Sequence, residues 1–497
     1  MSAALSVTPN AVSQPKQSRS PTDTSGGETP KAFKAYPIRA ILAIALIGVA
    51  TPAIWFGLDT LAIPGRAALI VFAIAVVAWS VLRMPETPVA IAGGLALVAV
   101  GATTSEKFYG GIGDDLIWLL IGAFVLAAVL KQSGLAERFT LRAISSAGNV
   151  QQLFYRLTWV IAATAFIIPS TSGRAALLLP VFLTLVEAID DRRLVRALAL
   201  LFPTVILLSA CASLLGAGAH MIAVDFMVQS GQPAIDFAQW ALLGTPFAII
   251  SSFAATAVIL KLFLQPGERV SALVLPKPQA MPITRAQVYI LLVTLLTIAL
   301  WATSSQHGVD AAVVALGGAL LATWKSVSGI ALKEALKGVE WNLILFLAAT
   351  LVMGEALIHS GAAAWIADAA INAFPVELLN HPVWLVAAAT LISMAAHLII
   401  ASRSARAMVL IPTVALPLAV APLEASALIF ITVVGSGFCQ TLKVSAKPVA
   451  LYAKLDVQTY SDADLARLSF WLMPIIAALL IVFAVWVWPL QGLVLVG

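Results

Sequence analysis

Residues 168–181 read IPSTSGRAALLLPV, and residues 400–413 read IASRSARAMVLIPT. Both stretches contain Ser-x-Ser, then an arginine, then a proline, at identical spacing. Each lies inside a long apolar run, where its short polar residues interrupt the pattern of a continuous helix. Non-helical backbone at membrane depth is tolerated where it lines a cavity or is buried in protein. We therefore predict that each stretch forms the tip of a re-entrant hairpin.

The composition places these stretches in a membrane protein. Charged residues make up 11% of the 497 residues and hydrophobic residues 61%, whereas a soluble domain has about 25% charged residues. Mean hydropathy is +0.99. So few charges cannot cover the surface of a soluble chain of this length. This excludes a soluble enzyme, a nucleic-acid-binding protein and a disordered protein.

The apolar runs outside the hairpins predict 11 transmembrane helices, since each is about long enough to cross a bilayer. They cover 38–58, 67–84, 88–103, 115–130, 195–227, 238–264, 287–301, 311–324, 341–358, 425–451 and 469–489. After one extra N-terminal helix, three runs precede each hairpin and two follow it. An odd number of spans inverts the second unit. The predicted fold is thus an all-α polytopic membrane protein with two inverted five-helix repeats, each with a re-entrant hairpin and a broken helix.

The predicted organisation follows from these runs and from the basic residues. It comprises a disordered cytoplasmic tail (1–37), an extra N-terminal helix (38–66), the first inverted repeat (67–264), a cytoplasmic linker (265–285) and the second inverted repeat (286–497). With a cytoplasmic N-terminus, most Lys and Arg residues face the cytoplasm, and Arg66 and Lys107 lie opposite. We expect an integral protein of a bacterial inner membrane with a periplasmic C-terminus.

A second break follows the hairpin in each repeat. The first reads SLLGAGAH at 213–220, and the second covers GSGF at 435–438 and LKVSAKP at 442–448. Glycines permit unwinding, and Pro448 cannot form the intrahelical hydrogen bond of its position. We expect each hairpin tip to face the second break of its own repeat.

The breaks predict an anion site. Helix N-termini after the tips offer free N–H groups, and the tip hydroxyls add further donors. Five basic residues lie in the membrane runs (Arg174, Arg403, Arg406, Lys443 and Lys447), against two acidic ones well inside them (Asp225 and Glu355). Such cations are expensive in a bilayer, so a negatively charged substrate explains them best. The candidate substrate-binding residues are Ser170, Thr171, Ser172, Ser402, Arg403, Ser404 and Lys447, and the candidate ion-binding or supporting residues are Gly173, Arg174, Gly216, Gly218, His220, Arg406, Lys443 and Ser445.

Some of these residues have a second interpretation. Arg174 and Arg406 occur in both copies, which fits contacts that stabilise the hairpins through backbone carbonyls as well as it fits anion binding. Lys447 has the alternative of snorkelling to the cytoplasmic surface. His220 and His397 fit packed, hydrogen-bonded histidines better than proton relays.

These features resemble the divalent anion:sodium symporter family, the dicarboxylate, citrate and sulfate carriers of the ion transporter superfamily. The resemblance covers residues 38–490 and rests on the span count, the hairpins and the tip motifs. It implies that the tips bind Na⁺ and substrate carboxylate, and that the chain forms a homodimer. It also implies a scaffold of the first three spans in each repeat and a moving part of hairpins and broken helices.

The tips depart from the pattern of that family, which reads Ser-Asn-Thr. Here they read Ser170-Thr171-Ser172 and Ser402-Arg403-Ser404, and the second breaks lack the family's Thr-Pro-Pro-Asn-like loop. Arg403 and Lys447 occupy places where the family coordinates Na⁺, so fixed cations could replace the ion in that half. A Na⁺ ion near Ser170, Thr171 and Ser172 remains chemically suitable, and no other cofactor is expected.

The leading hypothesis is a secondary active transporter of di- or tricarboxylates, or of sulfate, which works by alternating access. Exchange or proton coupling in place of sodium coupling is left open. A cation/proton antiporter needs more buried carboxylates than this chain offers. An intramembrane serine hydrolase needs a base beside its nucleophile, and no G-x-S-x-G or H-E-x-x-H motif occurs. The expected partners are a small anion and the lipid bilayer, with no nucleic acid.

Overall fold

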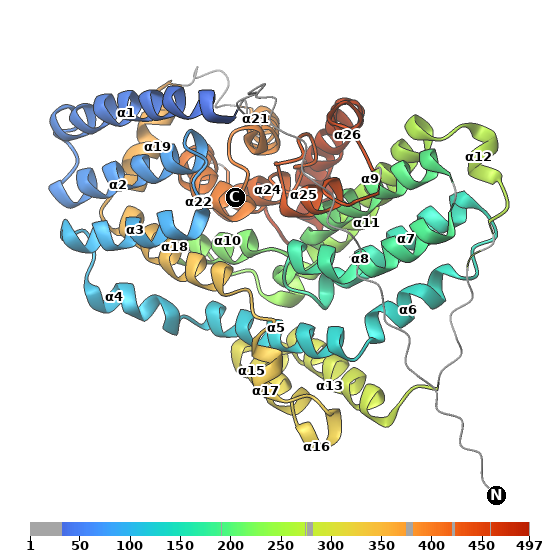
Figure 1. The fold of residues 1–497 in the computed structure, drawn as a ribbon. Coiled ribbons are helices and arrows are strands. Elements are labelled where there is room, and N and C mark those ends of the chain that lie inside the picture. The colour runs from blue at the N-terminus through green and yellow to red at the C-terminus, as the bar shows by residue number, and fades with distance from the viewer. Residues whose placement is uncertain are drawn as a thin grey trace, which may run out of the picture.

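The computed structural model describes residues 32–189, 191–273, 275, 282–373, 381–419, 423–457 and 459–496. The predicted tail up to residue 31 and most of the proline-containing part of the linker lie outside these ranges. The described residues are organised into helices, with two isolated β-bridges, Asn149–Ala272 and Leu423–Val496. The all-α prediction is therefore confirmed, and Figure 1 shows the arrangement.

The described residues of the first half form twelve α-helices. They are α1 (Ala32–Gly57), α2 (Ile63–Ser80), α3 (Glu86–Ala99), α4 (Ser105–Gly110), α5 (Asp115–Gln132), α6 (Leu135–Ile144), α7 (Val150–Ala163), α8 (Thr171–Ala188), α9 (Arg192–Leu208), α10 (Gly218–Gln229), α11 (Phe237–Phe263) and α12 (Pro266–Val270). Helix α1 begins at Ala32, inside the segment that was expected to be a tail.

The second half repeats this succession with shorter pieces. Its helices are α13 (Arg285–Ala302), α14 (Ser304–His307), α15 (Ala311–Ala322), α16 (Lys325–Ser328), α17 (Leu332–Leu336), α18 (Trp341–His359), α19 (Ala362–Ala373), α21 (Pro382–Ala395), α22 (Arg403–Leu410), α23 (Leu416–Leu418), α24 (Ala425–Gly435), α25 (Lys447–Ala453), α26 (Asp462–Val482) and α27 (Trp488–Leu490).

Nine helices in the described ranges are long and apolar enough to cross a membrane. Eight of them coincide with predicted spans, and the ninth is Thr171–Ala188, the second arm of the first hairpin. The other three predicted spans correspond to shorter apolar helices, α3, α15 and α24. Every predicted run therefore contains a helix, and the chain is an integral membrane protein.

The two hairpins have the same construction. In the first, α7 leads into a 3₁₀ turn (Thr164–Phe166), a short extended segment and then α8. In the second, α21 leads into a 3₁₀ turn (Ala396–Leu398), a short extended segment and then α22. Ser170 and Ser402 are the N-caps of α8 and α22, since their hydroxyls accept hydrogen bonds from Gly173 N and Ala405 N at 3.1 and 3.2 Å.

The broken helices also match the prediction. Two 3₁₀ turns, Ser209–Ala212 and Leu214–Gly216, separate α9 from α10, and irregular chain separates α24 from α25. Ala217 and Ala446 precede α10 and α25 with nearly identical extended backbones, φ −159° and −155°. A side chain at Gly216 would put Cβ 2.0 Å from the carbonyl oxygen of Ala210, so the first break is too tightly folded for any other residue there.

The helices pack in two groups. In one group α2 lies on α3, α3 on α18, α5 on α15 and α15 on α13; Figure 1 shows α1, α2, α3 and α18 stacked in succession. The other group contains both hairpins and both broken helices, with α11 packed on α9, α7 and α26, and α21 on α24. Helix α10 joins the groups through its contact with α18. The candidate site lies at this junction.

Candidate functional site

A pocket lies where the two hairpin tips, the two breaks and the starts of α3 and α18 meet. Its lining residues are Glu86, Ser170, Thr171, Ser172, Leu207, Ala217, Gly218, Glu340, Leu343, Ala401, Ser402, Arg403, Ser404, Cys439, Ala446, Lys447 and Pro448. The free volume is about 70 Å³, which holds a handful of water molecules. All the residues predicted to bind substrate, and Gly218 among the supporting ones, are thus brought together, although their roles remain predictions.

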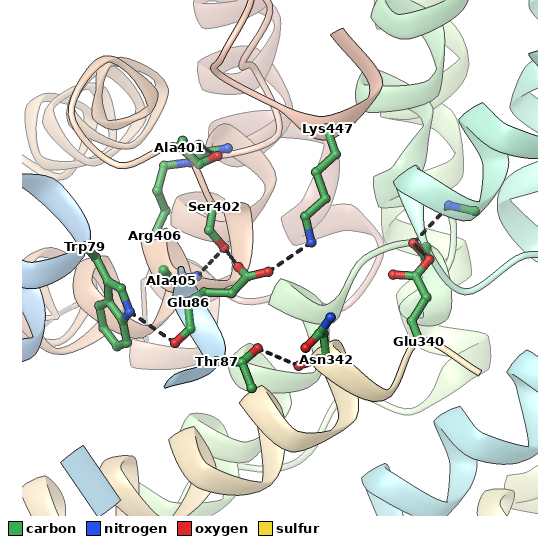
Figure 2. A network of polar contacts seen from close by, with 12 residues as sticks. Trp79, Glu86, Thr87, Glu340, Asn342, Ala401, Ser402, Ala405, Arg406 and Lys447 are labelled. Atoms are coloured by element: carbon green, nitrogen blue, oxygen red, sulfur yellow. Dashed lines mark hydrogen bonds and ion pairs between the residues drawn. The ribbon is translucent and has the colours of Figure 1, made fainter. Parts of the chain in front are cut away.

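Two glutamates bind the tips of the hairpins. Ser170 Oγ donates a hydrogen bond to Glu340 Oε1 at 2.6 Å, and Ser402 Oγ donates one to Glu86 Oε2. Lys447 Nζ donates to Glu86 Oε1 at 3.0 Å. Figure 2 shows these carboxylates approaching the tips from the α3 and α18 side. Each tip therefore already has a carboxylate at the N-terminus of its helix, where a negative charge is favoured.

The starts of α3 and α18 position the glutamates. Glu86 is the first residue of α3, and Glu340 is the N-cap of α18. Thr87 Oγ1 donates to the carbonyl of Asn342 at 2.8 Å, which ties the two helix starts together (Figure 2). Neither acid is among the residues predicted from the sequence, because only acidic residues inside the apolar runs point to a buried charge there. The available signal was that each stands at the N-terminal border of a run.

Arg403 lines the pocket and reaches into the first repeat. Its Nη2 lies 3.1 Å from His220 Nε2 and 3.4 Å from the carbonyl oxygen of Val433. His220 Nδ1 lies 3.0 Å from the carbonyl oxygen of Ser213, so a histidine with its proton on Nδ1 satisfies both contacts. Within the described residues, Nε and Nη1 of Arg403 are buried without a hydrogen-bond partner. Both atoms thus retain unused hydrogen-bond donors beside the pocket.

Arg174 and Arg406 are fully buried and bind protein oxygens. Arg174 Nη1 donates to the carbonyl of Ile206 at 2.8 Å, and its Nη2 donates to Ser209 Oγ at 2.7 Å. Arg406 Nη1 donates to the carbonyl of Ile400 at 2.8 Å, and its Nη2 donates to that of Ser436 at 3.0 Å. Neither lines the pocket. The interpretation as hairpin-stabilising contacts is the one that fits their geometry.

Each hairpin contacts the broken helix of the other repeat as well as that of its own. Arg174 and Arg406 join each hairpin to the break of its own repeat, as expected. In addition α22 packs on α10, and α8 packs on α25. The hydroxyl of Tyr452 in α25 donates to the carbonyl of Ala175 in α8 at 3.4 Å. The pocket is thus built by crossing contacts, in which a hairpin of one repeat packs on the broken helix of the other. These contacts were not predicted from the sequence.

The remaining candidates lie outside the pocket lining. Lys443 pairs with Asp462 at 3.4 Å, where α26 begins. Ser445 Oγ accepts a hydrogen bond from Leu442 N at 3.1 Å and closes a turn of the second break. His397 is hydrogen-bonded to Thr441 Oγ1 at 2.8 Å. Lys443, Ser445 and His397 therefore have structural partners away from the pocket, whereas Arg403 and Lys447 line it.

The first tip is suited chemically to the expected Na⁺ ion. It offers the hydroxyls of Ser170, Thr171 and Ser172, together with the carboxylate of Glu340, and hard cations prefer oxygen ligands. The described residues contain no group of three His, Cys, Asp or Glu residues suited to a metal. Sodium at this tip stays a prediction.

The helical fold, the paired re-entrant hairpins and the pocket at their tips define a polytopic membrane transporter. A family model described as a citrate transporter matches residues 67–435, and the chain belongs to that family. The resemblance to carriers of the ion transporter superfamily is thereby confirmed. The protein is a transporter and not an enzyme, so the alternative of an intramembrane hydrolase is wrong.

Several known proteins are similar to this chain. A dicarboxylate transporter of the chloroplast of Spinacia oleracea is 24% identical over 299 residues, which cover 56% of this chain and 52% of the relative. A citrate/succinate antiporter of Escherichia coli strain K12 is 24% identical over 366 residues, 69% of this chain and 72% of the relative. An uncharacterized transporter of Mycobacterium tuberculosis strain H37Rv is 26% identical over 296 residues, 58% of this chain and 67% of the relative.

The fold has a counterpart among solved structures. The crystal structure of the Alcanivorax borkumensis YdaH transporter, described as having an unusual topology, superposes with a TM-score of 0.50 at 14% identity. The match covers 78% of this chain and 89% of that one. At this identity the likeness concerns the fold alone.

Proposed function

We propose that this protein is a secondary active transporter of small di- or tricarboxylates that works by alternating access. The observation that carries the proposal is the binding of a carboxylate at each hairpin tip, by Ser170 and by Ser402 with Lys447. A pocket that holds two side-chain carboxylates has the donors for the carboxylates of a substrate. Arg403, with unpartnered N–H groups, supplies further positive charge.

Related proteins support a carboxylate substrate. One is named a citrate/succinate antiporter and two are named dicarboxylate transporters. Sulfate is the second candidate, because hydroxyl and guanidinium donors bind any small oxyanion. We place the protein in a bacterial inner membrane with its N-terminus in the cytoplasm, as the distribution of basic residues favours, and we propose a homodimer by analogy with the resembling family.

We further propose that transport proceeds by anion exchange without sodium. Arg403 and Lys447 provide fixed charges at the second tip, where the resembling family binds Na⁺. A fixed cation next to a carboxylate supplies the same Coulombic attraction as a bound ion. Proton coupling is the alternative for the same pocket.

Uptake into liposomes tests this function. Purified protein is reconstituted with and without internal succinate, and uptake of labelled succinate, malate, citrate and sulfate is followed in Na⁺ or choline buffer, with and without a pH gradient. We expect carboxylate uptake in choline that depends on internal anion. Uptake that requires Na⁺ would contradict the exchange proposal, and absence of carboxylate uptake under every condition would contradict the proposed substrate class.

Two lysines of the second break form a matched pair for the site itself. Lys447 lines the pocket, whereas Lys443 pairs with Asp462 outside it. We expect Lys447→Gln to weaken substrate affinity about tenfold, because a hydrogen bond to a charged group contributes roughly 1.5–3 kcal/mol. Lys443→Gln should leave affinity unchanged. Titration of both variants with substrate by calorimetry distinguishes them, and equal effects would remove Lys447 from the site.

A further inference from the structure

Two larger cavities adjoin the pocket, and a glutamate stands at the border with each. One cavity, of about 400 Å³, shares Glu86, Ser402 and Lys447 with the pocket. The other, of about 500 Å³, shares Glu340 with it and also contacts Gly173 of the first tip. The contacts of Glu86 with Ser402 and of Glu340 with Ser170 therefore lie at the borders between the pocket and the two larger cavities.

Both glutamates occupy the positions that favour a substrate carboxylate. Each accepts a hydrogen bond from the hydroxyl of an N-cap serine, Ser170 at the start of α8 or Ser402 at the start of α22. Glu86 also accepts a hydrogen bond from the ammonium group of Lys447, and the side chain of Glu86 is 14% exposed. The cavity that remains has room for a handful of water molecules. A di- or tricarboxylate can accept the hydrogen bonds of the Ser170 and Ser402 hydroxyls only after the glutamates leave them, because each hydroxyl has a single proton to donate.

These contacts are not needed to cap the helices that carry the glutamates. An acidic residue in the first turn of a helix is favoured by the helix dipole by about 0.3–1 kcal/mol without any further partner. Here the side chains instead cross from α3 and α18 to the hairpins, which belong to the other group of packed helices. The contacts join the two groups at both tips.

We propose that Glu86 and Glu340 are tethered substitutes for the substrate's carboxylates, which hold the empty hairpins to α3 and α18 until a substrate displaces them. The proposal rests on the proposed function. Without substrate, movement of the hairpins away from α3 and α18 breaks both serine–glutamate contacts and the ion pair of Lys447. It also leaves Lys447 without the counter-charge of Glu86, which is costly in a membrane. With substrate bound, its own carboxylates neutralise this lysine.

The consequence is obligatory exchange. In an empty transporter the two serine–glutamate contacts act as a latch that keeps the hairpins against α3 and α18. In a transporter with bound substrate the hairpins can move in either direction. Glu86 and Glu340 thus act as positioning residues, through Ser402, Lys447 and Ser170, and contribute no group to the chemistry of the substrate.

Neutral variants of the two glutamates test the latch. Glu86→Gln, Glu340→Gln and the double variant keep the side-chain size and remove the charge, and Glu355→Gln is the control, because Glu355 is on the same helix as Glu340 but pairs with Lys107. Each protein in liposomes is assayed for exchange, with internal succinate, and for net uptake, without it. Affinity for succinate and for citrate is measured by calorimetry in detergent.

We expect the ratio of net uptake to exchange to rise about tenfold in each single variant and further in the double one, with tighter substrate binding, because a competing charged hydrogen bond is lost. Glu355→Gln should behave like the unchanged protein. Damage to the fold alone would lower net uptake and exchange together without tightening binding.

Two results overturn the latch while leaving the function intact: an unchanged ratio in variants that still exchange, and loss of both activities in folded single variants. Failure of the unchanged protein to bind or transport any carboxylate would instead overturn the proposed function. The two failures are therefore distinguishable.

Discussion

At the residue scale, four arginine and lysine side chains near the tips have distinct tasks despite their similar sequence context. Arg174 and Arg406 donate hydrogen bonds to backbone carbonyls and are fully buried. Arg403 and Lys447 line the pocket. The repeated Ser-x-Ser-x-Arg spacing could predict where Arg174 and Arg406 lie. It could not assign their partners in the breaks, because the carbonyls of Ile206 and Ser436 lie 32 and 30 residues away from the arginines.

The buried arginine of the first hairpin should be essential for stability. Arg174→Leu leaves the carbonyl of Ile206 and the hydroxyl of Ser209 without their donor, so we expect a loss of about 3 kcal/mol or more. Arg142→Leu, at an exposed position in α6, should change stability by less than about 0.5 kcal/mol. Thermal unfolding in detergent measures both, and similar unfolding temperatures would contradict the structural task of Arg174.

The candidate site was largely predictable from the sequence, since every residue expected to bind substrate lines the pocket. Glu86 and Glu340 were not found. Both stand at the N-terminal borders of apolar runs, where α3 and α18 begin. Only the packing of α3 against α18 brings them to the tips. Lys443 was assigned to the site by its charge, whereas Asp462 provides its partner.

At the element scale, small residues allow the helices to pack closely. Gly122 of α5 faces α15, where an added Cβ would lie 2.7 Å from the carbonyl carbon of Ala315. Close approach of this kind is typical of helix pairs in membranes, where dispersion rather than the hydrophobic effect drives association. The helices themselves were predictable from apolar runs. Their pairing was not, because lipid-facing and helix-facing sides are both apolar.

A pair of glycine variants tests this packing. Gly122→Ala should destabilise the protein by about 1–3 kcal/mol, because the methyl group forces α5 away from α15. Gly317→Ala on α15 meets nothing within 4 Å, and it should be neutral or stabilising by about 0.5–1 kcal/mol, since alanine is the better helix former. Unfolding temperatures of the two variants should therefore move in opposite directions. A parallel decrease would argue against the α5–α15 contact.

At the scale of the whole molecule, the proposed topology places the linker and the α13–α15 connection on opposite sides of the membrane. Ser271→Cys and Ser305→Cys put a thiol at exposed positions of these two loops, while the native Cys211 and Cys439 are buried. A membrane-impermeant maleimide added to intact cells should label position 305 and spare position 271. Inverted vesicles should give the reverse pattern, and labelling of both loops from one side would refute the topology.

The crossing contacts between the repeats have a consequence for the origin of the protein. A single five-helix unit contains one tip and one break, and so it carries half of the pocket. Arg403 of the second unit bonds to His220 of the first, and α8 and α22 each pack on the broken helix of the other unit. An ancestor made of one such unit would therefore have needed a second copy as a partner to complete this pocket.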